Sequence, residues 1–68
     1  MKYILILWVC SFLNGQECMA PMEYPVVYDS WYECSRTAHK ESLALMTKMG
    51  YAYMNEHRIA MKYYCKEE

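Results

Sequence analysis

The sequence predicts a small α+β domain that is stapled by a disulfide. Two periodic patterns carry this prediction: helical spacing of apolar residues over about 31–49, and alternation of apolar and polar residues over about 58–66. The third observation is length, because a chain of 68 residues buries too little surface for a secure core without a cross-link. We expect one amphipathic helix packed on a returning strand, with an N-terminal extended arm or edge strand.

The first fifteen residues have the layout of a secretory signal peptide. The basic start Met1-Lys2 precedes an eleven-residue, almost wholly apolar run over 3–13, which Asn14 and Gly15 interrupt. A transmembrane helix needs about 20 apolar residues, so the run is short for a membrane span. We expect cleavage after Gly15, which leaves 16–68 as the domain of a secreted or periplasmic protein. An uncleaved membrane anchor through 3–13 and a lipid-anchored protein remain alternatives.

The extended arm and the helix follow in order. Residues 23–28 are rich in β-formers, but Pro25 lacks an amide donor, which confines the segment to an edge strand or an extended arm. Ser30 precedes Glu33 by three residues, which is the spacing of a capping box at a helix start. Gly50 follows the last apolar position, where a helix cap is expected. With Ser42, the apolar stripe consists of Trp31, Cys34, Ala38, Leu45, Met46 and Met49.

The returning strand is predicted from its alternation. Residues 51–57 are ambiguous, because they fit either an extension of the helix or a tight connection. In the strand over 58–66, one face would carry Ile59, Met61, Tyr63 and Cys65.

Helix and strand geometry predicts a Cys34–Cys65 disulfide. The helix climbs about 22 Å from Cys34 to Met49, and the strand returns about 23 Å from Arg58 to Cys65. If the chain reverses between them, the two sulfurs meet; otherwise both are buried thiols. Cys10 would leave with the leader, so Cys18 is predicted to be unpaired or to link two chains, unless it displaces Cys34 or Cys65.

No pattern in the sequence indicates catalysis. The chain has no CxxC motif, its two histidines are eighteen residues apart, and no nucleophile signature surrounds Cys34. We therefore expect no enzymatic activity, no catalytic residues and no cofactor. The net charge of −1 also argues against a nucleic-acid partner.

Methionine and tyrosine are the unusual components. Seven methionines suggest an alternative function as a soft-metal, copper-binding protein, although flexible core filling explains several of them equally well. The ligands of that alternative would be Met46, Met49, Met54, His57 and Met61. Eight tyrosines suggest a recognition surface, although wrapping of a small core explains several of them equally well. The candidate surface residues are Tyr32, Tyr64 and Tyr28.

Four features together resemble short exported proteins of unknown function in marine phages and their hosts. They are the hydrophobic start, Cys18 with Pro21 close behind, Tyr-Asp-Ser-Trp-Tyr-Glu-Cys over 28–34, and the segment 59–65. The resemblance implies export and a small cysteine-tied domain, and it carries no activity or ligand. The leading hypothesis is an exported, non-enzymatic interaction protein with a protein or cell-surface partner, contact with the membrane only through the signal segment, and a possible homodimer.

Overall fold

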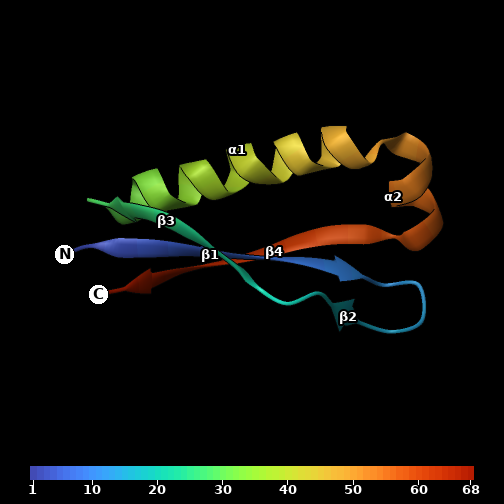
Figure 1. Ribbon diagram of the computed structural model, residues 1–68, viewed down its shortest axis with the longest axis horizontal. Coiled ribbons are helices and arrows are strands. Elements are labelled where there is room, and N and C mark those ends of the chain that lie inside the picture. The colour runs from blue at the N-terminus through green and yellow to red at the C-terminus, as the bar shows by residue number, and fades with distance from the viewer.

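Strand β1 (Tyr3–Ser11) is the central strand of an antiparallel sheet in the computed structural model, which describes residues 1–68. Strand β4 (Ile59–Glu67) pairs with one edge of β1, and β2 (Glu17–Cys18) and β3 (Met22–Tyr28) pair with different stretches of the other edge. Helix α1 (Trp31–Met49) lies along one face of the sheet, and α2 (Tyr51–His57) leads into β4 (Figure 1). The predicted α+β architecture with a helix, a returning strand and a disulfide staple is confirmed.

The side chains of β1 alternate between the helix-covered face and the open face of the sheet. Leu5, Leu7 and Val9 point to the covered face and are buried, whereas Ile4, Ile6 and Trp8 are only partly buried. The same run of apolar residues therefore serves both faces of a central strand. The register with β4 is regular along its whole length, with Leu5 opposite Cys65 and Leu7 opposite Tyr63.

Strand β3 is an edge strand, as its proline predicts. It pairs only with β1, and its register shifts between Ile4 and Ile6. Pro25 lies in the β3 segment that spans this shift, between the pairs formed by Glu23 and Val27. An irregularity here is expected, because proline cannot donate a ladder hydrogen bond.

The two helices meet at Gly50. The predicted start of α1 is confirmed, since the Ser30 hydroxyl accepts a 3.1 Å hydrogen bond from the amide of Glu33. Gly50, at φ 86°, ends α1 and donates its amide to the carbonyl of Met46. The ambiguous segment is a separate short helix, and Arg58, at φ 51°, ends it in the left-handed region before β4 begins. Neither helix combines the length and apolar character that a membrane crossing requires.

The core is small and centres on β1. Leu5, Cys34, Ala38 and Cys65 form a buried cluster, and four tyrosines pack against it: Tyr3, Tyr24, Tyr28 and Tyr63. Only seven of 68 residues are buried, and four of them belong to β1. Such a core gives little stability by itself, so the fold depends on covalent cross-links for much of its stability.

While residues 1–15 are present, the apolar run that resembles a leader forms β1 in the middle of the sheet. The predicted domain over 16–68, which requires cleavage after Gly15, stays a prediction. One detail of the predicted helix differs from expectation. Within the predicted helix stripe, Trp31 is 52% and Met46 41% exposed. Trp31 stands at the helix start and contacts Tyr3 edge-on, while Met46 lines an open cleft beside α2.

Candidate functional site

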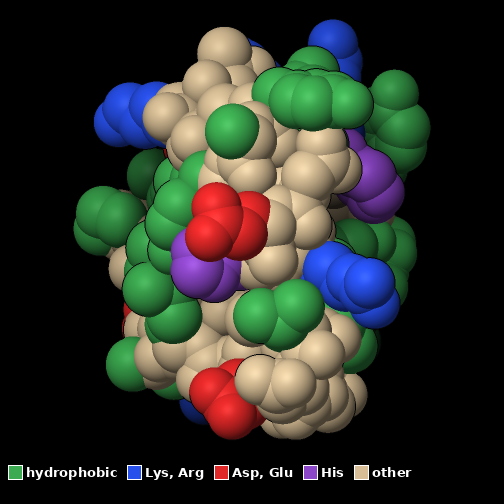
Figure 2. All heavy atoms as spheres, turned by 90° about the vertical axis from the view of Figure 1, so that its right-hand side faces the viewer, with side chains coloured by type: hydrophobic (Ala, Val, Ile, Leu, Met, Phe, Trp, Pro, Cys, Tyr) green, Lys and Arg blue, Asp and Glu red, His purple; other side chains and the backbone are tan.

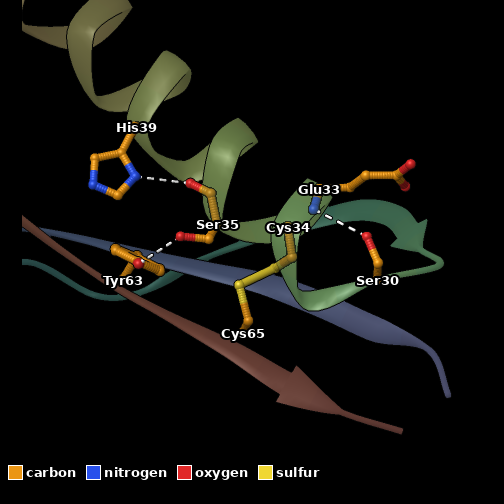
Figure 3. Close-up of a disulfide and its surroundings, with 7 residues drawn as sticks. All are labelled: Ser30, Glu33, Cys34, Ser35, His39, Tyr63 and Cys65. Carbon is orange, nitrogen blue, oxygen red and sulfur yellow. Dashed lines mark hydrogen bonds between the residues drawn. A yellow bond between two sulfur atoms is a disulfide. The ribbon is translucent and has the colours of Figure 1, made fainter.

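The Cys34–Cys65 disulfide joins the first turns of α1 to the end of β4. The two Cα atoms are 6.1 Å apart and both cysteines are buried, so the predicted pairing is confirmed. Directly beside the disulfide, the hydroxyls of Ser35 and Tyr63 lie 2.8 Å apart, and one helical turn further the His39 ring stands edge-on to Tyr63 (Figure 3). Strand β4 is therefore attached to α1 by one covalent bond, one hydrogen bond and one aromatic contact.

A second disulfide joins Cys10 to Cys18, which corrects the prediction that Cys18 is unpaired. The two residues are directly opposite in the β1–β2 register, and no cysteine in the chain is free. The prediction was made for a chain that has lost Cys10 with the leader, and it does not hold while residues 1–15 are present. The two sulfurs also differ in environment, since Cys10 is 1% exposed and Cys18 is an exposed residue.

Strand β1 fills a slot that the rest of the chain forms around it. Both β3 and β4 pair with β1 and neither pairs with the other. Helix α1 supplies the floor through Cys34 and Ala38, against which Leu5 packs with no exposed surface. Sequence reasoning did not find this slot, because it requires the apolar run over 3–13 to be read as a strand.

Three groups at the margin of the slot have shifted pKa values: Tyr24, Lys2 and Asp29. Partial burial, the Glu41 carboxylate and Tyr28 raise the pKa of the Tyr24 phenol, which keeps this core-packed side chain neutral. At the open end, Lys2 forms an ion pair with Asp29, just before the α1 cap. The hydrogen bond and the attraction between them raise the pKa of Lys2 and lower that of Asp29.

The three tyrosines predicted to form one recognition surface lie apart. Tyr64 is on the open face of the sheet, opposite Ile6, and is 53% exposed. Tyr32 projects from the exposed side of α1, where it lines a shallow hollow with Arg36. Tyr28 packs against the core. The prediction of a shared surface is therefore wrong, because the periodicity of each separate element does not fix how their faces are oriented in the fold.

The open face of the sheet is an uncovered apolar region. Ile4, Ile6 and Trp8 lie on it, beside the exposed Tyr64 and Val27. Lys62 extends over the Trp8 ring, with its Nζ 5.3 Å from the ring centroid. Both helices lie on the other side of the sheet (Figure 1).

The predicted soft-metal ligands separate into different places. Met46 and Met54 line a cleft of about 660 Å³ at the α1–α2 junction, whereas Met49 and His57 line another of about 210 Å³ near β2. Met19, which the sequence analysis did not consider, also lines the second cleft. Met61 lines neither cleft and lies on the covered face of β4. The turn at Gly50 directs α2, with Met54 and His57, away from the line of α1.

The end of the molecule that carries α2 and the β1–β2 turn is chemically mixed. Figure 2 shows hydrophobic side chains on both sides of this end, with a histidine beside each group and charged side chains between them. Comparison of the chain with protein-family models, with curated proteins and with solved structures finds no match. Functional inference therefore rests on the geometry described above.

Proposed function

We propose that this is an exported, non-enzymatic interaction protein that acts in the cell envelope or outside the cell. The observation that carries the proposal is the pairing of all four cysteines around a core of seven buried residues. Disulfides of this kind persist in oxidising compartments and are reduced in an ordinary cytosol. Two disulfides and the apolar start together support export.

Uncovered apolar surface supports the interaction role. A sheet with one bare face exposes Val27 and Tyr64, and the exposed large side chains elsewhere include Trp31 and Tyr32. Aromatic side chains with few rotatable bonds give large contact area at low entropic cost, which is the composition typical of recognition surfaces. The partner in this proposal is a protein or a cell-surface component.

The test is the intact mass of the protein from the exported fraction, after thiol alkylation with and without prior reduction. We expect no alkylation of any paired cysteine until reductant is added. A mass that begins at Gln16 would give three cysteines in the product, and a complete chain would give four. A chain found only in the cytosol, with every thiol alkylated before reduction, would overturn the proposal.

A further inference from the structure

We propose that removal of the leader opens the slot between β3 and β4, and that a β-strand from a partner protein fills it. The inference rests on the proposed export, because it requires the leader to be cut away. It names the site of interaction and the chemistry of the partner: an extended strand with aliphatic residues at alternate positions and a cysteine directly after the last of them.

The expected cleavage point is accessible in the folded chain. Residues 12–20, which connect β1 through β2 toward β3, are all exposed, and Gly15 takes a turn conformation at φ 94°. A cut after Gly15 would separate the central strand from the remaining elements without cutting any of them. Exposed turns of this kind are the preferred sites of proteolysis.

The walls of the slot remain attached to α1 after β1 leaves. Strand β4 is held through Cys34–Cys65 and through the Ser35–Tyr63 hydrogen bond. A single residue, Asp29, lies between the end of strand β3 and the Ser30 cap, so only a short link separates the strand from the helix. Neither attachment involves a residue before Gly15. The two strands would then expose unpaired backbone edges on either side of an apolar floor, which is an acceptor for strand addition.

Strand β1 specifies what the slot accepts. It runs antiparallel to both walls, and pairs with β4 at nine successive positions from Tyr3 to Ser11. Its inward residues Leu5, Leu7 and Val9 are at most 5% exposed. The outward positions face the open side of the sheet, so the type of side chain that the partner strand carries there is less restricted. An incoming strand therefore needs an aliphatic residue at every second position.

Cys18 supplies a covalent lock. It faces the position of Cys10 across the β1–β2 ladder, and it is the exposed member of that disulfide. A leader cut after folding stays linked to Cys18. It is released when a partner thiolate attacks the Cys18 sulfur: the new disulfide forms, the Cys10–Cys18 bond breaks, and Cys10 leaves as a thiolate that takes up a proton. This exchange conserves the number of disulfides and needs no added oxidant.

The experiment uses the full chain with a specific protease site in the 12–16 turn and with Cys10→Ser/Cys18→Ser, which removes the tether. The folded protein is nicked and unfolded in urea, and the released N-terminal fragment is separated from the rest of the chain while both are unfolded. The remaining chain is then refolded with excess fluorescent peptide of sequence 3–13. We expect one labelled strand to co-elute with each 16–68 chain, with the helical circular dichroism restored. A Leu5→Thr/Leu7→Thr peptide should bind at least 100-fold more weakly, whereas the matched outward control Ile4→Thr/Ile6→Thr should lose less than tenfold.

The possible results separate the inference from the proposed function. Equal binding of the inward and outward variants, or failure of the refolded chain to bind the unmodified peptide, would each overturn the slot. Retention of Cys18 adds a second readout, since a peptide with cysteine at the position of Cys10 should become disulfide-linked and one with serine should not. The intact-mass measurement tests export independently. Strand capture by a chain that is never exported would overturn the proposed function alone.

Discussion

The two disulfides differ in whether they involve the predicted leader and in how exposed they are. Cys34–Cys65 joins two elements outside the predicted leader, spans 31 residues and is buried at both ends. Cys10–Cys18 spans eight residues, has one partner inside the leader, and has one exposed member. If the predicted leader is cut away as we propose, the first disulfide survives and the second does not. On this proposal the molecule has a permanent part, α1 with β4, and a conditional part, β1 with β2.

The largest expected effect comes from truncating the covered face of the conditional part. Leu7→Ala should destabilise the oxidised full chain by about 3–5 kcal/mol, because Leu7 has no exposed surface and sits in the central strand. Ile6→Ala, one position along on the open face, should cost about 1 kcal/mol. Urea unfolding followed by circular dichroism measures both. Equal losses would show that β1 does not distinguish its two faces.

Removing each disulfide in turn tests whether the permanent part is held more strongly than the conditional part. Loop-closure entropy gives roughly 3.7 kcal/mol for Cys34–Cys65 and roughly 2.5 kcal/mol for Cys10–Cys18. We therefore expect Cys34→Ala/Cys65→Ala to lower the free energy of unfolding more than Cys10→Ala/Cys18→Ala does. Graded reduction with alkylation should modify Cys18 before the buried pair. If both measurements ranked the disulfides the other way, Cys10–Cys18 would be the more stabilising and more resistant bond, and the division into these two parts would be wrong.

The permanent part is also the part that sequence reasoning reached. Helical spacing and strand alternation are local signals, so the bounds of α1, the face of β4 and the meeting of Cys34 with Cys65 followed from them. The conditional part did not follow, because an unbroken apolar run fits a signal peptide and a two-faced central strand equally well. Cys10 was assigned with that run, so its pairing with Cys18 was missed. The tyrosine surface failed for a different reason: the relative orientation of faces on separate elements is set by packing, which no single periodicity reports.

The smallest expected effect on stability comes from the ion pair between Lys2, just before β1, and Asp29, in the turn before α1. Both side chains are well exposed, so salt should screen the interaction strongly. The folded pKa of Asp29 lies below its ordinary value of 3.8, so its stabilising contribution is present above that value and is lost as the pH falls through the lowered pKa. The folded pKa of Lys2 lies above 10.5, so its contribution is complete below that value and is lost as the pH rises through the raised pKa.

The Lys2–Asp29 ion pair therefore stabilises the folded chain from about pH 4 to about pH 10, and only while Lys2 remains bound next to Asp29. NMR titration of the Asp29 carboxyl in the full chain measures the acid limb. Lys2→Met should return the pKa of Asp29 toward 3.8, and high salt should do so in part. Exchange of the cleaved and reduced leader, through urea, for an acetylated peptide of sequence 3–13 should have the same effect as Lys2→Met, because that peptide lacks Lys2. An Asp29 pKa that stays low after this exchange would show that groups other than Lys2 hold the carboxylate.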